Sequence, residues 1–166
     1  MHAFLDIALV RVDNRLVHGQ ILEAWVPFIK AAYIIVVDDQ VACDFFSETV
    51  IRMAVPRKVK LTIHSVDDFA KSIAFHRGSG QKTIVLFNRL TDALKAYRLG
   101  FRFETLNIGN IYNENCKLCC TPSVLLSDDD IRDLCALHDM GAGIELQRVP
   151  REKPVDFYDI VRRLKS

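Results

Sequence analysis

Residues 33–37 read Tyr-Ile-Ile-Val-Val, a short run that is apolar at every position. A strand with one face in water alternates apolar and polar residues, whereas a strand covered by helices on both faces can be apolar throughout. Residues 83–87, Thr-Ile-Val-Leu-Phe, are apolar at every position after the threonine. These two runs therefore predict inner strands of a sheet that is covered on both sides.

On either side of these runs, strand patterns and helix patterns alternate along the chain. Expected strands lie at 7–12, 33–37, 59–63, 83–87, 105–108, 123–126 and 143–149, and expected helices at 19–31, 44–54, 66–76, 91–99, 128–140 and 155–164. The alternation predicts an α/β fold: an open, twisted, mainly parallel sheet of about seven strands with helices on both faces. Because no helix precedes it, the strand at 123–126 is the candidate for an antiparallel strand.

Several expected helix ends carry the residues that helix termini prefer. Ser65, Thr91 and Ser127 each stand before acidic residues and are expected N-caps. Gly100 and Gly141 stand where C-terminal glycines are expected. Residues 77–81 read as a flexible loop.

Length and charge narrow the class of protein. The chain has 166 residues, of which 50% are hydrophobic, and this predicts a single domain over residues 1–166 with a full core. The 22 basic and 21 acidic residues leave a net charge of +1, which argues against bulk attraction to nucleic acid or an anionic membrane. No apolar run approaches 18 residues and no signal peptide pattern is present, so we expect a cytoplasmic protein.

The five cysteines do not suggest a disulfide framework, because their number is odd and no secretion signal is evident. Cys116-Lys-Leu-Cys119-Cys120 contains a CxxC spacing, which raises the question of a metal site. A structural zinc site needs a second ligand pair, and the cysteines at 43 and 135 do not supply one at suitable spacing. We therefore expect reduced thiols and no metal.

The segment 11–20 reads Arg-Val-Asp-Asn-Arg-Leu-Val-His-Gly-Gln and places Asp13, Arg15 and His18 within six residues. It follows the first expected strand and leads into the first expected helix, so it lies at the carboxyl edge of the sheet. Open α/β sheets bind ligands at that edge. Polar residues also end other expected strands, at 38–39, 88–89 and 107–110. The sequence therefore predicts a site around His18.

A neutral imidazole can act as a general base, a metal ligand or a nucleophile. The other histidines, at 2, 64, 76 and 138, belong to different elements, which argues against His18 as a metal ligand. A phosphoryl acceptor needs positive charge and N–H donors, which Arg15 and the backbone near Gly19 supply, while Asp13 can orient the ring or Arg15. The pattern fits a phosphohistidine; a solvated histidine beside an ordinary surface ion pair is the alternative.

The same loop carries a resemblance to a known family. Residues 11–25 resemble the signature of the enzyme IIB component of the sugar phosphotransferase system, in its mannose/fructose/sorbose class. Further stretches resemble that family in order and spacing, at 35–42, 53–56, 106–109, 125–131 and 141–150. The resemblance therefore covers nearly the whole chain.

The resemblance implies a phosphocarrier. In that family the matching histidine, His18, takes a phosphoryl group from a phosphohistidine of the IIA partner and passes it to a sugar held by the membrane components IIC and IID. It also implies a cytoplasmic protein peripherally associated with the permease, without cofactor or metal; a homodimer stays open. The implied catalytic residues are His18, Arg15 and Asp13, the phosphate-binding residues Arg15, Gly19 and Gln20, and the candidates for lining the site Asn14, Asp38, Asp39 and Asn107.

Two positions depart from the family pattern. Asn14 replaces the usual second aspartate of the loop, which removes one negative charge and is expected to favour the phosphorylated form. Asn107-Ile-Gly-Asn110 replaces a frequent Asn-x-Gly-Gly. The arginines at 11, 15 and 89 are expected to give the rim of the site a positive charge suited to acidic partners.

Two other functions remain open from the sequence. Asp38-Asp39 after a strand is also found in phosphoaspartate receiver domains, but the further residues of that pattern are missing here. Helix capping is an equally good account of this pair. The second alternative is a regulatory phosphohistidine module that is not coupled to sugar transport.

Overall fold

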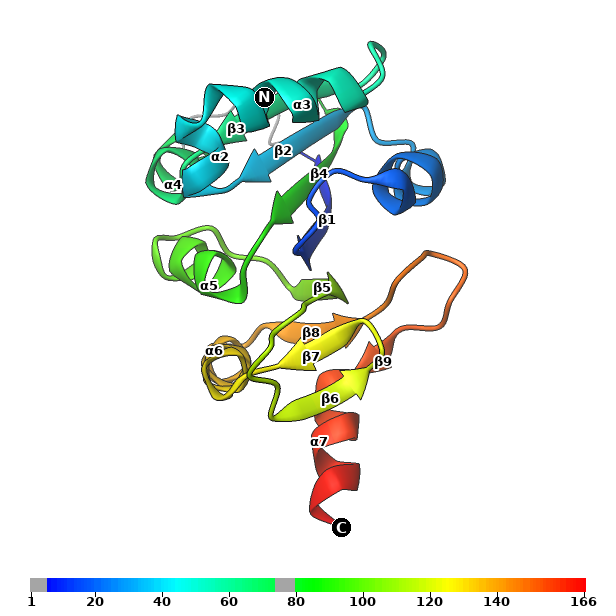
Figure 1. The fold of residues 1–166 in the computed structure, drawn as a ribbon, viewed down its shortest axis with the longest axis vertical. Helices are drawn as coiled ribbons and strands as arrows, with labels where there is room; N and C mark the ends of the chain where they lie inside the picture. The colour runs from blue at the N-terminus through cyan, green and yellow to red at the C-terminus, as the bar shows by residue number, and fades with distance from the viewer. Residues whose placement is uncertain (1–5, 74–79) are drawn as a thin grey trace.

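The computed structural model describes residues 6–73 and 80–166. Within these residues seven strands form one sheet in the order β3-β2-β4-β1-β5-β8-β9 (Figure 1). All neighbours pair in parallel except β9, which runs antiparallel to β8. The predicted mainly parallel sheet is therefore confirmed. The strands are β1 (Asp6–Asp13), β2 (Tyr33–Val37), β3 (Lys60–His64), β4 (Lys82–Phe87), β5 (Thr105–Asn110), β8 (Gly143–Leu146) and β9 (Val155–Asp156).

Helices cover both faces of the sheet, as predicted. Side chains of η1, α1 and α3 pack with one face, whereas those of α4, α5 and α6 pack with the other. Figure 1 shows α5 and α6 on the side of the strands opposite to the helical segment that follows β1. In the described part of the chain, no helix is long and apolar enough to cross a membrane. The helices are η1 (Gln20–Trp25, a π-helix), α1 (Val26–Ile29), α2 (Asp39–Cys43), α3 (Phe45–Ala54), α4 (Val66–Ile73), α5 (Leu90–Arg98), α6 (Asp128–Asp139) and α7 (Phe157–Lys165).

The apolar runs that predicted inner strands are indeed buried. Residues 34–37 of β2 and 83–87 of β4 are all buried. On the α5 face, the ring of Phe69 lies 6.1 Å from that of Phe87 and 4.8 Å from that of Phe101. Burying a large apolar side chain contributes roughly 1.5–3 kcal/mol, so these rings and strands anchor the carboxyl edge of the sheet in a fixed core.

Two strands were not expected, and one expected strand lies elsewhere. Residues 124–126 form β7 (Val124–Leu126), which pairs antiparallel with β6 (Leu118–Thr121) in a separate two-stranded sheet. The seventh strand of the main sheet is instead β9, at the start of the helix expected over 155–164. A strand of two residues is too short to show periodicity. The expected strand over 143–149 ends at Leu146, and residues 147–149 lie in the loop that follows it.

The helix ends follow the predicted capping chemistry with one exception. Ser127 forms a capping box with Asp130, and Gly100 and Gly141 have φ of +111° and +103° after α5 and α6. The expectation for Thr91 is wrong, because α5 already begins at Leu90. Residues 74–76 of one expected helix, and 77–79 of the expected loop, lie outside the described residues.

The first helical segment is shorter and less regular than a continuous helix over 19–31. The predicted helix over 19–31 consists of η1 followed by a single turn, α1, which has Pro27 in its first turn. Pro27 lacks a backbone donor and its ring crowds the preceding turn, which is where the irregular segment η1 lies. The helix ends at Lys30, which has a left-handed conformation with φ of +59° and donates to the carbonyls of Val26 and Pro27. The short helix α2 was not expected before α3.

Candidate functional site

The site is built around Asp13, the last residue of β1. Its carboxylate is fully buried and accepts three hydrogen bonds from Arg15: from the backbone N–H at 3.1 Å, from Nε at 3.0 Å and from Nη2 at 3.0 Å. The bond from the backbone of Arg15 closes an Asx turn, and the Asp13 carbonyl accepts from Leu16 N–H at 2.9 Å. Asp13 thus folds the loop around its own carboxylate.

His18 is held by the same carboxylate. Its Nε2 lies 3.1 Å from Asp13 Oδ2, and its Nδ1 accepts a hydrogen bond from Gln20 N–H at 3.3 Å. Because Nδ1 accepts a hydrogen bond, it carries the lone pair of the neutral ring, and Nε2 carries the ring proton. The side chain is 16% exposed, so part of the imidazole reaches the surface.

The charges of the site favour an ionised Asp13. Burial raises the pKa of this carboxyl, but the hydrogen bonds from His18 and Arg15 outweigh burial and hold the pKa well below its usual range. The side chain of Arg15 is 40% exposed, and its Nη2 also donates to Gln20 Oε1 at 3.0 Å. A fixed carboxylate therefore lies under an arginine and a histidine that both reach the surface.

Arg11 is a functional candidate that sequence reasoning placed wrongly. It was expected at the rim, but it is fully buried in β1, and its Nη2 donates to Asp13 Oδ2 at 3.2 Å. Burial lowers the pKa of its guanidinium to about 10, against the attraction of Asp13, so it stays charged near neutral pH. An arginine inside an otherwise apolar strand was the sequence signal for this role.

Asn14 connects the loop to the ends of both strands beside β1. Its Nδ2 donates to the carbonyl of Asn88 after β4 at 2.7 Å, and its Oδ1 accepts from Tyr112 N–H after β5 at 2.6 Å. Its own N–H donates to the carbonyl of Asn110 at 2.9 Å. The side-chain amide therefore serves as donor and acceptor at the same time, which an aspartate cannot do at neutral pH.

The other lining candidates bond to residues outside the His18 loop. Asp38 caps α2 by accepting from Val41 N–H at 2.8 Å, and Asp39 accepts from Val66 N–H, at the start of α4, at 2.8 Å. Among the described residues neither carboxylate has a hydrogen bond to the His18 loop, which favours the capping interpretation. Asn107 is buried beneath the loop, where it contacts Arg11.

The cysteines show no arrangement for metal or disulfide chemistry. Over residues 6–73 and 80–166 no group of three or more His, Cys, Asp or Glu could hold a metal ion. All five cysteines are free, and Cys119 on β6 is exposed. Burial raises the pKa of the Cys120 thiol to about 11, so it stays protonated near neutral pH.

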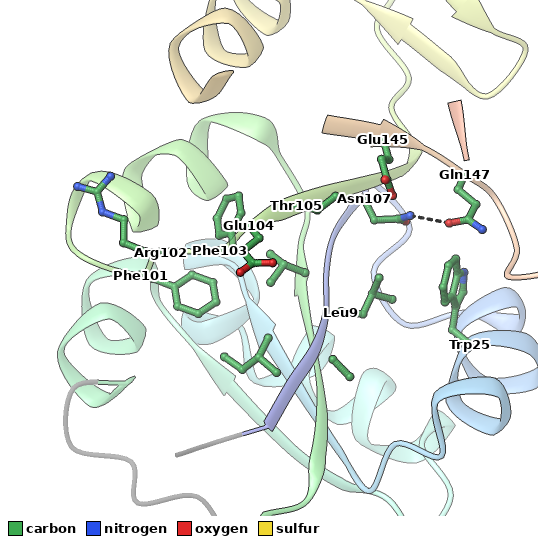
Figure 2. A pocket seen from close by; sticks show the side chains of 13 residues that line it. Leu9, Trp25, Phe101, Arg102, Phe103, Glu104, Thr105, Asn107, Glu145 and Gln147 are labelled. Carbon is green, nitrogen blue, oxygen red and sulfur yellow. Dashed lines mark hydrogen bonds between the residues drawn. The ribbon is translucent and has the colours of Figure 1, made fainter. Parts of the chain in front are cut away.

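Two cavities lie near the loop. One, of about 450 Å³, opens between the amino half of β1, Trp25 and residues 101–105, with Asn107 and Gln147 in its wall (Figure 2). The other, of about 570 Å³, lies beside Gly19 and Gln20 and extends to Phe28 and residues 149–151. Only the second adjoins the residues expected to bind phosphate, and it offers an apolar ring beside them.

Comparison with known proteins defines the class that this fold and loop belong to. The sequence model described as the PTS system sorbose subfamily IIB component matches residues 7–166. The chain therefore belongs to this family of the sugar phosphotransferase system, which confirms the resemblance seen in the loop. It is thus a component of the transferase machinery for sugar uptake.

Individual relatives agree with this assignment. The chain is 34% identical over 160 residues to the PTS system fructose-specific EIIB component of Bacillus subtilis (strain 168), covering 96% of this chain and 98% of that protein. It is 27% identical to the PTS system mannose-specific EIIAB component of Escherichia coli (strain K12), covering 97% of this chain but 50% of that longer protein. The structure superimposes on the IIBSor domain of the sorbose permease from Klebsiella pneumoniae with a TM-score of 0.87, at 28% identity and covering 96% and 98% of the two chains.

Proposed function

We propose that this chain is a phosphocarrier in which His18 Nδ1 accepts a phosphoryl group from a phosphohistidine of a IIA partner and passes it to a sugar. The observation that carries this proposal is the division of roles between the two ring nitrogens. Asp13 Oδ2 accepts from Nε2, so the lone pair resides on Nδ1, the nitrogen that does not face the buried carboxylate. A nucleophile held in one tautomer by a carboxylate is the arrangement that phosphoryl acceptance requires.

The transfer has a simple balance of bonds. The Nδ1 lone pair forms a P–N bond while the P–N bond of the donor phosphohistidine breaks and returns its electron pair to the donor ring. The His18 ring then carries a positive charge with the proton still on Nε2, and ionised Asp13 compensates this charge at 3.1 Å. In the second step a sugar hydroxyl oxygen attacks phosphorus, the P–N bond of His18 breaks, and the hydroxyl proton leaves to solvent.

Arg15 and the backbone of Gln20 stabilise the transferred group. Arg15 holds a fixed position on Asp13 through Nε and Nη2 and is 40% exposed, so its charge faces the phosphoryl oxygens without further rearrangement of the loop. Once Nδ1 is phosphorylated, Gln20 N–H no longer has a lone pair to bind there and donates to a phosphoryl oxygen instead. Exposed Gly19 leaves room for this approach.

The partners follow from the class. The name of the mannose-specific relative from Escherichia coli joins IIA and IIB in one protein, which supports a IIA domain or protein as the phosphodonor here. The sugar is bound by membrane IIC and IID components, with this chain at the cytoplasmic side of the permease. No cofactor takes part, because the P–N bond keeps the phosphoryl group activated.

Label mapping after incubation with a phosphorylated IIA donor tests the proposal. We expect one acid-labile phosphoryl group on His18, no labelling of His18→Ala, and full labelling of His138→Gln, a matched control at an exposed histidine on α6. Membranes that contain IIC and IID, together with sugar, are expected to discharge the label. If His18→Ala accepts the group as fast as the native chain, the proposal is wrong; label that membranes and sugar never discharge favours the regulatory alternative.

A further inference from the structure

The guanidinium of Arg11 occupies a closed socket beneath the site. Its Nη1 donates to Asn107 Oδ1 and to the carbonyl of Gln147 at 2.7 Å, and its Nη2 donates to the carbonyl of Arg148 at 3.0 Å. The same Nη2 donates to Asp13 Oδ2 at 3.2 Å. Arg11 therefore bonds to β5, to the loop after β8 and to the centre of the site at once.

The socket is shaped by residues that bond to neither His18 nor Arg15. At Gly109 a Cβ would lie 1.8 Å from Arg11 Nη2 and 2.1 Å from its Cζ, so any larger residue would have to displace the guanidinium. The ring of Trp25 lies 5.3 Å from Arg11 Cζ, within cation–π range. Figure 2 shows the hydrogen bond from Asn107 to Gln147, with Trp25 beside them. Gln147 in turn donates to the carbonyl of Glu152 at 2.8 Å, a hydrogen bond within the loop between β8 and β9.

A buried guanidinium is an unfavourable choice for stability alone. Apolar residues of similar volume are often as stable in such places, and here Nε of Arg11 has no hydrogen-bond partner among the described residues. What Arg11 adds is a third donor on Asp13 Oδ2, the oxygen that also accepts from His18 Nε2 and from Arg15 Nη2. Of these donors Arg11 is the one that is fully buried, so it fixes the oxygen from within the sheet.

We propose that Arg11, Asn107 and Gly109 are positioning residues for phosphoryl transfer, acting through Asp13 to keep the proton on His18 Nε2 and the lone pair on Nδ1. The inference rests on the proposed phosphocarrier function and extends it to residues on another strand. Asn107 and Gly109 hold the guanidinium, the guanidinium holds the carboxylate, and the carboxylate holds the imidazole. Displacement of Arg11 therefore releases the ring to rotate and to exchange tautomers.

Gly109→Ala tests the socket, with Gly143→Ala on the neighbouring strand β8 as the matched control. A Cβ at Gly143 would meet only the carbonyl oxygen of Glu104 at 3.3 Å and Thr105 Oγ1 at 3.5 Å. The tautomer of His18 is measured from the ¹⁵N shifts of the labelled imidazole in the unphosphorylated protein, which needs no donor. The rate of phosphoryl acceptance from phosphorylated IIA is measured in parallel.

For Gly109→Ala we expect the ¹⁵N shifts to move toward a mixture of tautomers and the acceptance rate to fall about 10- to 100-fold, as when residues that orient a reacting group are removed. Gly143→Ala is expected to retain the native shifts and rate. Because the added methyl acts by displacing the guanidinium, Gly109→Ala combined with Arg11→Met should lose little more than Arg11→Met alone. Asn107→Ala, which removes one acceptor without a clash, gives the same readouts if Gly109→Ala does not fold.

The positioning proposal is wrong if folded Gly109→Ala has native ¹⁵N shifts and a native acceptance rate. If Gly109→Ala does not fold, the same result in folded Asn107→Ala would contradict it. Equal losses in Gly143→Ala would do the same, because the effect would then not depend on Arg11. A native chain that takes no label on His18 would instead contradict the proposed function. The tautomer comparison stays valid in that case, so the two failures can be told apart.

Discussion

Asn14 and Asn88 are joined by a 2.7 Å hydrogen bond from the side-chain amide of the first to the carbonyl oxygen of the second. The bond ties the His18 loop to the end of β4. In Asn14→Asp, which restores the residue usual in this family, a carboxylate oxygen would face that carbonyl without a proton between them. We expect a loss of about 1–3 kcal/mol in the free energy of unfolding, measured by urea denaturation near neutral pH.

Asn115→Asp is the matched control for this change, because Asn115 is exposed and its side chain has no hydrogen bond among the described residues. It adds the same charge and is expected to change the free energy of unfolding by less than about 0.5 kcal/mol. Equal stability of the Asn14→Asp and native chains would show that the amide bond to Asn88 contributes nothing.

The same substitution is expected to shift the phosphorylation equilibrium. A second carboxylate in the loop repels the phosphoryl group, and a repulsion of about 1 kcal/mol at an effective dielectric constant suited to the protein surface corresponds to roughly fivefold less phosphorylated His18. The measurement is the ratio of phosphorylated to free chain at equilibrium with the IIA donor. A ratio equal to that of the native chain would contradict the idea that Asn14 favours the phosphorylated form.

Much of the fold could be predicted because its strongest signals are local. The run at 33–37 is apolar throughout and the run at 83–87 is apolar after Thr83, and burial on both faces is the simplest cause of that pattern. The order of elements then placed the His18 loop at the carboxyl edge. By contrast, β6 and β9 are only four and two residues long. They form because they pair with β7 and β8, and the local sequence pattern does not predict this pairing.

The support beneath the site could not be predicted, because its contacts join distant parts of the chain. Arg11 bonds to Asn107 and Gln147, which are 96 and 136 positions away. From sequence, an arginine within an apolar strand is unusual, but the pattern does not show what Arg11 contacts, and Gly109 resembles an ordinary loop glycine. The pairing of β1 with β5 shows that the guanidinium of Arg11 fills the space beside Gly109 that a larger side chain would occupy.

Replacing Asp13 with asparagine should impair both transfer and stability. Asparagine keeps the size of the side chain but removes the charge that compensates a phosphorylated His18 ring and a buried Arg11. Leaving a buried charge without its partner typically costs about 3–5 kcal/mol, and we expect a loss of stability of that order. The acceptance rate, measured by rapid quench under folding conditions, is expected to fall about 100-fold. A folded Asp13→Asn that accepts phosphate at the native rate would remove Asp13 from the mechanism.

Asp13 should also make the protein sensitive to acid. Its folded pKa lies below the unfolded value of about 3.9, so its contribution to stability is fully present above that pH and is lost as the pH falls toward the folded pKa. Between pH 5 and pH 2 the native chain is therefore expected to lose more stability than Asp13→Asn, measured by urea midpoints across that range. Parallel curves for the two proteins would show that this carboxylate is not the group involved.

Arg15→Lys separates the role of charge from the role of geometry. Lysine keeps the positive charge but cannot bind both oxygens of Asp13 as Nε and Nη2 of Arg15 do, each at 3.0 Å. Because the side chain is 40% exposed, we expect a stability change of less than about 1 kcal/mol. The acceptance rate is expected to fall about tenfold, because a mobile ammonium is no longer fixed toward the phosphoryl oxygens. Arg162→Lys, at an exposed ion pair with Asp159 on α7, is the control and should leave the rate unchanged. A native rate in Arg15→Lys would show that charge alone is sufficient at this position.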